Sequence, residues 1–404
     1  MKVAVIGQGY VGLPLAIKIS LAGHKVVGFD LNFELIKKLN MGNSHIEDVP
    51  NVQMEKAIES QKYLATATAK DLIDCEIVII AVPTPLDSNR LPDLQHVISA
   101  AELLGKNLKR KTLVINESTS YPGTLRNIIA PTVLKFTPPG IDHLFAISPE
   151  RVDPGNKEWD LSSTPRIIAG LTPESAKKAL EFYSSFCKEL IEVSSPEVAE
   201  TAKLFENTFR QVNIALVNEL ALTTRALGIS VTEVIEAAST KPYGFMKFSP
   251  GIGVGGHCIP IDPSYLAFAA ESVGVKARFI ELANSVNLQM PQEIVKRIKL
   301  ENGGMLQNKD VLVCGLAYKS NIGDIRESPS VDLVGYLRGE GANVTWHDPL
   351  VETWKSEMTT NLGTKKFDIT VVAILHDIMN RESILESSNY VFDCTGKLKS
   401  RHQL

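Results

Sequence analysis

The chain opens with the run Lys2-Val-Ala-Val-Ile-Gly7-Gln-Gly9-Tyr-Val-Gly12, and this stretch decides the fold. An apolar, strand-like run leads into a Gly-x-Gly-x-x-Gly turn, which a helical segment follows. In such a unit Gly7 permits the tight turn, Gly9 lets a pyrophosphate approach the backbone, and Gly12 allows close helix–strand packing. The pyrophosphate then lies on the helix N-terminus. The run therefore predicts a dinucleotide-binding domain of the Rossmann type.

The cofactor is predicted from Asp30, which ends the second expected strand 18 residues after Gly12. A carboxylate at this place binds the ribose 2′-hydroxyl of a dinucleotide and repels a 2′-phosphate. No arginine follows in residues 31–40, so we expect NAD rather than NADP. Tyr10 and Val11, which stand between the last two glycines, are predicted to join the cofactor site. The alternative for Asp30 is a turn residue that closes a strand.

The rest of the N-terminal half alternates short apolar runs with helical segments, which is typical of βαβ units and a parallel sheet. The expected strands are Val3–Ile6, Lys25–Phe29, Cys75–Ala81, Thr112–Asn116 and Leu144–Ile147. Ligands of open α/β sheets bind beyond the carboxyl ends of the strands. Pro83, Thr84 and Thr119 follow such ends and are candidate contacts of cofactor or substrate. The alternative is ordinary turn chemistry.

A long helix is predicted over residues 196–228, with Pro196 in its first turn and Gly228 at its end. A helix of this length exceeds what one small domain requires. We therefore expect it to link two domains and to supply a homodimer interface.

A second α/β unit is expected from about Lys309 onward, without a Gly-x-Gly-x-x-Gly turn. Its expected strands are Asp310–Gly315, Asn343–Trp346, Phe367–Leu375 and Tyr390–Cys394, with a helix over Ser328–Gly339. The prediction is an α/β protein in three parts. Residues 1–195 form an NAD-binding Rossmann domain, 196–300 a central helical domain with one long helix, and 301–404 a C-terminal Rossmann-like domain.

Composition excludes several classes of function. The 404 residues carry a formal net charge of −4, which gives no electrostatic reason to expect nucleic-acid binding. No apolar run approaches the roughly 18–20 residues that span a bilayer. The strand-like start leaves no room for a signal peptide, so we expect a cytoplasmic protein without a membrane partner. The five cysteines lack paired spacing, so neither a disulfide framework nor a metal site is predicted.

Cys258 alone among the cysteines lies among glycines, at the end of the run Gly251-Ile-Gly-Val-Gly-Gly-His-Cys258. Glycines remove side chains, so that a ligand or a substrate carbon can approach the sulfur. A thiol of pKa about 8.5 is only a few per cent thiolate at neutral pH. A reactive Cys258 therefore needs a nearby cation, base or helix N-terminus, and Lys203 and Asp262 are candidates.

The long helix presents polar residues in a row. Lys203, Asn207 and Arg210 stand at i, i+4 and i+7 and share one face. From spacing alone this face is read either as part of a site or as a solvated polar stripe.

Seven ordered motifs give the chain a resemblance to the nucleotide-sugar 6-dehydrogenases, the UDP-glucose/GDP-mannose dehydrogenase family, over essentially its whole length. The motifs are Gly7-Gln-Gly-Tyr-Val-Gly-Leu-Pro14, Val82-Pro-Thr-Pro85, Glu117-Ser-Thr-Ser-Tyr-Pro-Gly123, Ser148-Pro-Glu-Arg151, Glu200-Thr-Ala-Lys-Leu-Phe-Glu-Asn207, Gly255-Gly-His-Cys-Ile-Pro-Ile-Asp262 and Gly315-Leu-Ala-Tyr-Lys-Ser-Asn-Ile-Gly-Asp-Ile-Arg-Glu-Ser328. Such enzymes oxidise the C6 alcohol of a UDP-sugar to a carboxylate with two NAD+. The second hydride transfer requires a tetrahedral adduct, which the thiol would supply as a thiohemiacetal before a thioester is hydrolysed.

The resemblance implies catalytic roles residue by residue. Cys258 would be the nucleophile. Lys203 and Asn207 would stabilise the developing oxyanion, or Lys203 would shuttle the C6 proton. Asp262 would orient a base or a water near the sulfur. Glu150 would assist hydrolysis of the thioester, and Thr119 would hold water and contact the cofactor.

The resemblance also implies contacts to the UDP-sugar. Arg151, Val152 and Arg210 resemble residues on the sugar side. The loop from Gly251 through Gly255 to Gly256 would wrap the uridine diphosphate. Lys319 and Arg326 would reach the diphosphate or the nicotinamide side from the C-terminal domain. The alternative for Lys319 and Arg326 is surface charge beside Asp324 and Glu327.

The run from Lys241 to Cys258 and the run from Ser148 to Gly155 resemble the branch that acts on UDP-N-acetylglucosamine. Pro154 stands where the UDP-glucose branch usually carries a further glutamate. UDP-N-acetylmannosamine, UDP-N-acetylgalactosamine and UDP-glucose stay open as substrates. Two other functions also stay open. A two-electron NAD-dependent hydroxyacid or sugar-acid dehydrogenase would yield one NADH without using Cys258, and an NAD-sensing protein would bind NAD without turnover.

Overall fold

The computed structural model describes residues 1–46, 48–153, 156, 158–363, 365–398 and 400–404. Pro154, at which the sequence differs from the UDP-glucose branch, lies outside these residues. The chain divides into two compact units. The N-terminal unit holds Met1–Glu206 and Ser264–Gly274, and the C-terminal unit holds Asn207–Pro263 and Val275–Leu404. Each unit is described by itself, and the predicted domain boundaries stay a prediction.

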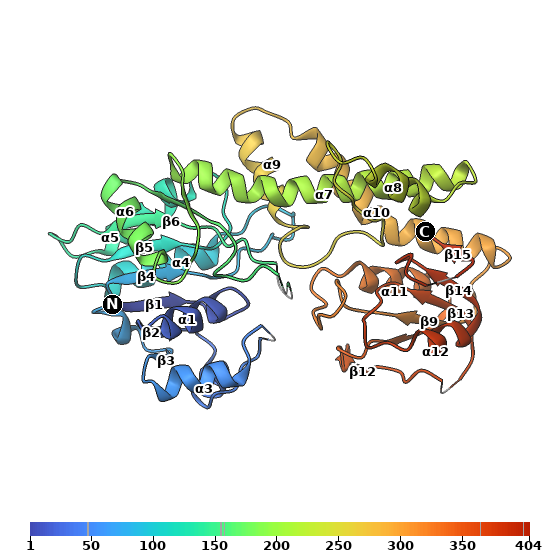
Figure 1. Cartoon of the computed structure of the whole chain (residues 1–404), viewed down its shortest axis with the longest axis horizontal. Helices are drawn as coiled ribbons and strands as arrows, with labels where there is room; N and C mark the ends of the chain where they lie inside the picture. The colour runs from blue at the N-terminus through green and yellow to red at the C-terminus, as the bar shows by residue number, and fades with distance from the viewer. Residues whose placement is uncertain (47, 154–155, 157, 364, 399) are drawn as a thin grey trace. The chain divides into compact units, whose positions relative to one another are not determined.

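The N-terminal unit contains an eight-stranded sheet in the order β3-β2-β1-β4-β5-β6-β7-β8 (Figure 1). Its strands are β1 (Lys2–Ile6), β2 (Lys25–Phe29), β3 (Tyr63–Thr66), β4 (Ile77–Ile80), β5 (Leu113–Asn116), β6 (Leu144–Ile147), β7 (Arg166–Gly170) and β8 (Leu190–Glu192). Neighbouring strands are parallel except β6 and β7. The five predicted strands are confirmed, and β3, β7 and β8 were not predicted. The strand β7 begins with a buried arginine, whose charge hides the apolar pattern.

Helices connect the strands of this sheet. They are α1 (Gly12–Leu21), α2 (Phe33–Asn40), α3 (Asn51–Glu59), α4 (Gln95–Asn107), α5 (Ala130–Phe136) and α6 (Pro173–Tyr183), with the shorter turns η1 (Ala69–Leu72) and η2 (Leu125–Ile129). The side chain of Asn32 caps α2, and a capping box between Thr172 and Ser175 starts α6. Such caps satisfy N–H groups that have no partner within the helix.

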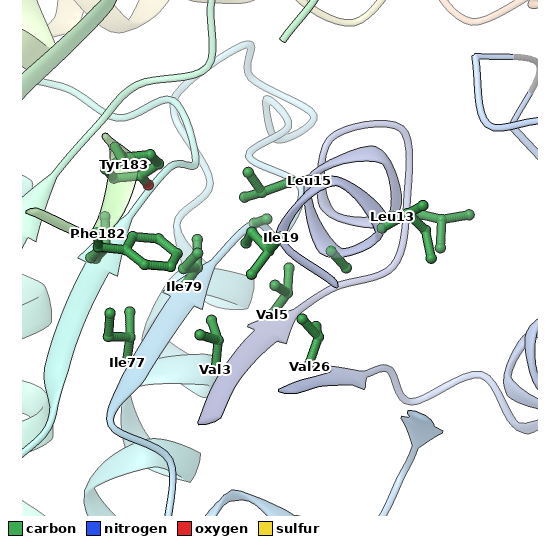
Figure 2. Packing of buried hydrophobic residues seen from close by; sticks show 14 of the residues in the cluster. Val3, Val5, Leu13, Leu15, Ile19, Val26, Ile77, Ile79, Phe182 and Tyr183 are labelled. Atoms are coloured by element: carbon green, nitrogen blue, oxygen red, sulfur yellow. The ribbon is translucent and has the colours of Figure 1, made fainter. Parts of the chain in front are cut away.

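The core of this unit fixes the first helix against the first strand. Figure 2 shows Leu15 and Ile19 of α1 pointing toward Val5 and Ile79 of the sheet. These side chains are fully buried. Burial of one such side chain contributes about 1.5–3 kcal/mol to the free energy of unfolding. The packing thereby places the start of α1 at the carboxyl end of β1, where the glycine turn lies.

The C-terminal unit contains a second, five-stranded parallel sheet in the order β10-β9-β13-β14-β15 (Figure 1). Its strands are β9 (Asp310–Cys314), β10 (Asn343–His347), β13 (Phe367–Val372), β14 (Ser388–Asp393) and β15 (His402–Gln403), with a hairpin of β11 (Thr353–Trp354) and β12 (Glu357–Met358). Its helices are α8 (Val231–Ser239), α10 (Arg278–Glu301), α11 (Pro329–Gly339) and α12 (Arg381–Glu386). The predicted second α/β unit is confirmed.

The long helix α7 spans Pro196–Ala226, and α9 spans Asp262–Ser272. Ser195 accepts a hydrogen bond from the Val198 amide at 3.4 Å, as expected of a residue before the first turn. Gly228 follows the end with a φ of +73°, a conformation that glycine adopts without steric cost. The prediction of one helix over 196–228 is confirmed. Within the described ranges, no helix is long and apolar enough to cross a bilayer.

Candidate functional site

The glycine turn after β1 has the geometry of a dinucleotide site. A Cβ atom on Gly7 would stand 2.4 Å from the Ala81 carbonyl oxygen, and one on Gly12 would stand 1.9 Å from the Gly7 oxygen. Neither position can hold a side chain. A Cβ atom on Gly9 would meet nothing within 4 Å, so open space lies over the middle of the turn. The backbone at Gly9 and the exposed start of α1 can therefore receive a pyrophosphate.

The carboxylate of Asp30 is held beside this turn. One oxygen accepts a hydrogen bond from the Gln8 amide at 2.9 Å, and the other accepts one from the Asn32 amide at 2.9 Å. The Gln8 side chain is fully buried, and the Tyr63 hydroxyl donates to it at 2.8 Å. The residues thus fit NAD, with the carboxylate oriented toward the turn. Gln8 and Tyr63 were not predicted, because neither belongs to the glycine pattern.

The predicted loops after β4 and β5 are joined by one hydroxyl. Ser118 Oγ accepts from the Val82 amide at 2.9 Å and donates to the Val82 carbonyl oxygen at 2.8 Å. The Tyr265 hydroxyl donates to the Pro85 carbonyl oxygen at 3.0 Å. Within these loops Pro83 is exposed, Thr84 is buried and Thr119 is half-buried. The two strand ends therefore lie side by side, as the sequence predicted.

Glu150 follows β6 and is held by charge-assisted hydrogen bonds. Its Oε1 accepts from the amides of Arg151 and Val152 at 2.7 and 2.6 Å, and its Oε2 accepts from Arg166 Nη2 at 3.0 Å. Burial opposes ionisation, but Arg166, these amides and the nearby Lys203 together hold the pKa of Glu150 below its usual value. A carboxylate in this setting is charged at neutral pH and can act as a base.

Arg166 also joins a second carboxylate that was not predicted as a site residue. Its Nη1 donates to Glu117 Oε1 at 2.7 Å and to Ser148 Oγ at 3.1 Å. The Tyr183 hydroxyl donates to the same Glu117 oxygen at 2.5 Å. Glu117 and Ser148 lie within motifs that the sequence singled out, but their partners come from β7 and α6. Spacing alone gives no signal of this network.

Arg151, a predicted sugar contact of the N-terminal unit, takes part in an ion pair. Arg151 Nη2 lies 2.7 Å from Glu206 Oε1, and Arg151 Nη1 donates to the Pro165 carbonyl oxygen at 2.7 Å. Lys203 is buried, with 8% of its surface exposed, which argues against a solvated stripe at this position. Arg210, on the part of α7 that belongs to the C-terminal unit, is exposed.

Cys258 lies in the C-terminal unit and is the one exposed cysteine among the described residues. Its carbonyl oxygen accepts from the amides of Ile261 and Asp262, at 3.1 and 2.8 Å, so the thiol stands on the turn that enters α9. Asn207 Nδ2 donates to Asp262 Oδ2 at 2.5 Å. The structure thus brings together two predicted catalytic residues, Asn207 and Asp262, beside the turn that carries Cys258.

The glycines before Cys258 are required by packing within their own unit. A Cβ atom on Gly253 would stand 2.6 Å from the Asn287 oxygen. One on Gly255 would stand 2.7 Å from the Glu327 oxygen, and one on Gly256 would stand 2.7 Å from the Tyr318 ring. Only at Gly251, among the glycines of this loop, would a Cβ meet nothing within 4 Å. The sequence explained these glycines by room for a ligand, and the structure adds close backbone packing as a reason.

Arg326 and the glycine loop are tied through the backbone, since Gly256 donates to the Arg326 carbonyl oxygen at 3.0 Å. The Arg326 guanidinium pairs with Asp324, with Nη2 to Oδ2 at 2.6 Å, and leaves 45% of the side chain exposed. Lys319 is half-buried. The pairing with Asp324 is the arrangement expected of the surface-charge alternative.

The predicted catalytic residues therefore stand in both units. Thr119, Glu150 and Lys203 belong to the N-terminal unit, and Asn207, Cys258 and Asp262 belong to the C-terminal unit. Models of one protein family match three parts of the chain. They match residues 1–187 as the NAD binding domain, 197–289 as the central domain and 312–400 as the UDP binding domain of this family. The chain belongs to the UDP-glucose/GDP-mannose dehydrogenase family.

Similar proteins cover nearly the whole chain. It is 37% identical to UDP-N-acetyl-D-glucosamine 6-dehydrogenase of Pseudomonas aeruginosa, over 93% of this chain and 90% of the relative. It is 38% identical to UDP-N-acetyl-D-mannosamine dehydrogenase of Pyrococcus horikoshii, over 87% of this chain and 84% of the relative. The solved structure of a UDP-D-ManNAc dehydrogenase from Pyrococcus horikoshii aligns with a TM-score of 0.90 at 34% identity, over 100% of this chain and 97% of that one.

These findings confirm the resemblance seen in the sequence, the predicted fold class and the predicted NAD cofactor. The member of this family described here is an NAD-dependent UDP-sugar dehydrogenase. The alternative of an NAD-sensing protein is therefore not supported.

Proposed function

We propose that this family member oxidises the C6 alcohol of UDP-N-acetylglucosamine to the carboxylate, in two steps, with Cys258 as the nucleophile. The observation that carries the proposal is the exposed thiol on the turn into α9, with Asn207 and Asp262 joined beside it. The cofactor supplies the chemistry of hydride acceptance, twice per sugar. The protein supplies the nucleophile, the charges and the water.

The first oxidation gives an aldehyde, which has no hydroxyl on the reacting carbon. The Cys258 thiolate adds to this carbon and forms a C–S bond, and the carbonyl oxygen becomes an alkoxide. Lys203 and Asn207 are the groups we assign to stabilise that oxygen, since an ammonium and an amide both donate hydrogen bonds. Loss of a second hydride from this adduct leaves a thioester on Cys258.

Hydrolysis of the thioester consumes one water, releases the carboxylate and returns the thiol. Glu150 is the base that we assign to this step, because its carboxylate is charged at neutral pH and partly accessible, with 13% of its side chain exposed. Asp262 orients a base or water near the sulfur. Thr119, half-buried at the end of β5, is assigned to hold water beside the cofactor.

The uridine diphosphate is assigned to the glycine loop of the C-terminal unit. Gly251 supports this role because open space lies over it, and Gly255 is assigned to the same loop although it is closely packed against Tyr318 and the Glu327 backbone. Lys319 and Arg326 supply the cationic donors that phosphate groups require. Arg151, Val152 and Arg210 are assigned to the sugar side.

The identity of the sugar is supported by two resemblances. The runs 148–155 and 241–258 resemble the branch that acts on UDP-N-acetylglucosamine. The relatives described above are named for UDP-sugars with an acetamido group at C2, of the gluco and manno configurations. UDP-N-acetylglucosamine is our first choice, and UDP-N-acetylmannosamine is the nearest alternative.

The experiment is to incubate the enzyme with NAD+ and each of four UDP-sugars, to count NADH formed per sugar, and to identify the products by mass spectrometry. The sugars are the N-acetylated gluco, manno and galacto forms and UDP-glucose. We expect two NADH with UDP-N-acetylglucosamine and little turnover of UDP-glucose. Preferred turnover of UDP-glucose would overturn the substrate. One NADH per sugar, with full activity retained in Cys258→Ala, would favour the two-electron dehydrogenase.

We also propose that a second copy of the chain docks on α7. Val198, Phe205, Phe209 and Leu216 are exposed by 36% or more although they are apolar, and Ala202 and Val212 complete a spacing of alternating four and three residues. That spacing places them in one stripe on the helix, as in a coiled-coil seam. A stripe of this kind is suited to pack against its own copy in a symmetric dimer.

A further inference from the structure

The carboxylate of Glu117 is buried in an arrangement that stability alone does not explain. It is 1% exposed, and burial raises its pKa to about 7. Its Oε1 accepts from Arg166 and Tyr183, but its Oε2 has no hydrogen-bond partner in the described part of the chain. A buried acceptor left without a donor costs free energy, so its presence calls for a reason.

The reason suggested by the contacts is the second carboxylate on the same arginine. Arg166 Nη1 binds Glu117 at 2.7 Å, while Nη2 binds Glu150 at 3.0 Å. Arg166 is 4% exposed, and its guanidinium stacks on the Tyr183 ring at 4.9 Å from the ring centre. One buried cation is therefore shared between two carboxylates and fixed in its plane.

We propose that Glu117, Arg166 and Tyr183 are positioning residues that set the orientation and base strength of Glu150 for thioester hydrolysis. The inference rests on the function proposed above, in which Glu150 is the base. The backbone of Glu117 meets Glu150, since its carbonyl oxygen accepts from the Glu150 amide at 3.4 Å. The side chains of Glu117 and Tyr183 act on the Glu150 carboxylate through Arg166. The fork geometry of a guanidinium makes this possible, because one plane can donate to two acceptors at once.

The charges that face Glu150 come from several elements. Arg166 opens β7, Lys203 lies on α7, and Glu117 directly follows β5. Two further groups near this network, the Cys187 thiol and the Tyr183 hydroxyl, lose their protons only at high pH and are neutral at physiological pH. Burial raises the pKa of the Cys187 thiol to about 11 and that of the Tyr183 hydroxyl well above its usual value.

Loss of the charge on Glu117 and loss of the Arg166 guanidinium should change the pKa of Glu150 in opposite directions. Above about pH 7 Glu117 is charged, competes for Arg166 and so makes Glu150 a stronger base than a lone arginine pair would. When Glu117 is neutralised, Arg166 serves Glu150 alone, and the pKa of Glu150 falls. When the guanidinium is replaced by an ammonium, the fork is lost, Glu150 is less well compensated, and its pKa rises.

The experiment follows the covalent adduct on Cys258. A single turnover is started with NAD+ and whichever of the four UDP-sugars yields two NADH. The thioester peptide is quantified by mass spectrometry after quenching, between pH 5.5 and 9. Because the pKa of Glu150 lies below its usual value, this base is charged across the whole range, and a change in the rate constant for loss of the thioester near pH 7 reports the ionisation of Glu117.

We expect the wild-type rate constant to rise by up to about tenfold as Glu117 loses its proton near pH 7, since a like charge near a carboxylate shifts its pKa by about one unit. Glu117→Gln should stay at the lower rate constant throughout, because Arg166 then serves Glu150 alone at every pH. Tyr183→Phe keeps the ring but removes a hydrogen bond that favours the charged form of Glu117, so it should move the rise to higher pH. Arg166→Lys should start from a higher rate constant than the wild type at pH 5.5, because the pKa of Glu150 rises. The rate of the first NADH release should change little in all three.

The matched control is Glu174→Gln, which removes an exposed carboxylate of α6 that pairs with Lys111 at 2.8 Å. It should leave the rise near pH 7 in place. A merely structural role would slow hydrolysis in all three network variants by a factor that does not depend on pH, and that result would overturn the inference.

The two proposals fail in different ways. If no thioester forms on Cys258 in the wild-type enzyme, the proposed function is wrong and this inference is wrong with it. If the thioester forms but Glu117→Gln keeps the rise near pH 7, only the inference is wrong.

Discussion

The cofactor site depends on glycines, which lack a side chain, and on the carboxylate that Asp30 carries. Gly9 leaves open space over the turn, whereas Gly7 and Gly12 are compelled by contacts with backbone oxygens. Asp30 supplies a carboxylate that two backbone amides hold in place. Because both amides come from the same edge of the sheet, the carboxylate keeps one orientation, which suits recognition of a ribose diol.

Replacement of Asp30 should weaken NAD binding. We expect Asp30→Ala to raise the dissociation constant of NAD roughly 10- to 100-fold, because a hydrogen bond to a charged group is worth about 1.5–3 kcal/mol. Asp30→Arg should in addition improve NADP binding. Isothermal titration with each cofactor checks both. Glu34→Gln, at an exposed carboxylate of α2, is the control and should bind NAD as the wild type does. An Asp30→Arg variant that still preferred NAD would contradict the role.

In the loop before α9, close packing requires some of the glycines, whereas open space lies over Gly251. Gly255 and Gly256 press against Tyr318 and the backbone at 326–327, which fixes the turn that carries Cys258. The Gly251 amide instead donates a hydrogen bond to Asn218 Oδ1 at 2.9 Å, and Gly251 has room for a methyl group. The same run thus holds glycines of two kinds.

This difference predicts two outcomes for the same substitution. Gly255→Ala should lower the free energy of unfolding by about 1–3 kcal/mol, because overpacking forces the backbone to shift. Gly251→Ala should leave that free energy within about 0.5 kcal/mol of the wild type and weaken UDP binding. Urea unfolding and a fluorescence titration with UDP measure the two effects. Unchanged UDP affinity in Gly251→Ala would argue against contact with the diphosphate.

The helix α7 carries the predicted dimer contact. Leu216→Glu places a charge in the apolar stripe, where 63% of the leucine is exposed. We expect the variant to shift sedimentation toward the monomer, because a charge buried in a seam without a partner is costly. Glu219→Gln, an exposed residue of the same helix, should sediment as the wild type does. A wild-type enzyme that stays monomeric at micromolar concentration would refute the dimer.

At the scale of the whole molecule, buried carboxylates shape the dependence of stability on pH. Burial raises the pKa of Glu117 and of Glu200 to about 7. Between the unfolded pKa near 4.5 and this value, the folded protein holds protons that the unfolded chain has released. Linkage then requires these groups to lower the free energy of unfolding as pH rises through that window. Buried histidines such as His143, whose pKa is lowered, act in the opposite sense.

Comparison of the wild type with Glu117→Gln isolates one of these contributions, because the histidines cancel in the difference. The free energy of unfolding of the variant, relative to the wild type, should rise by about 1–3 kcal/mol between pH 4.5 and 7.5. Urea unfolding followed by circular dichroism at four pH values measures it. Glu174→Gln should show no such rise in this window. A difference that stays flat, or falls, with pH would mean that Glu117 is charged throughout.

Much of this architecture could be predicted because it is local. The strands β2 and β6 match their predictions residue for residue, since each is an apolar run bounded by turns. The edge strands β3 and β8 were missed because a short strand at a sheet edge carries little periodic signal. The turn at Gly7, the carboxylate at Asp30 and the thiol at Cys258 could be predicted as site residues because their motifs are short and contiguous.

The sequence by itself determined the two α/β sheets, the long helix and the cofactor class, and it predicted the nucleophile. Each depends on neighbours in the chain, through strand and helix periodicity or through the steric freedom of glycine. Only the tertiary structure decided that Arg166 joins Glu117, 49 positions away, to Glu150, and that Tyr183 donates to Glu117 across 66 positions. Contacts of this range arise when separate strands close on one buried charge, and no local pattern encodes which carboxylate that charge will meet.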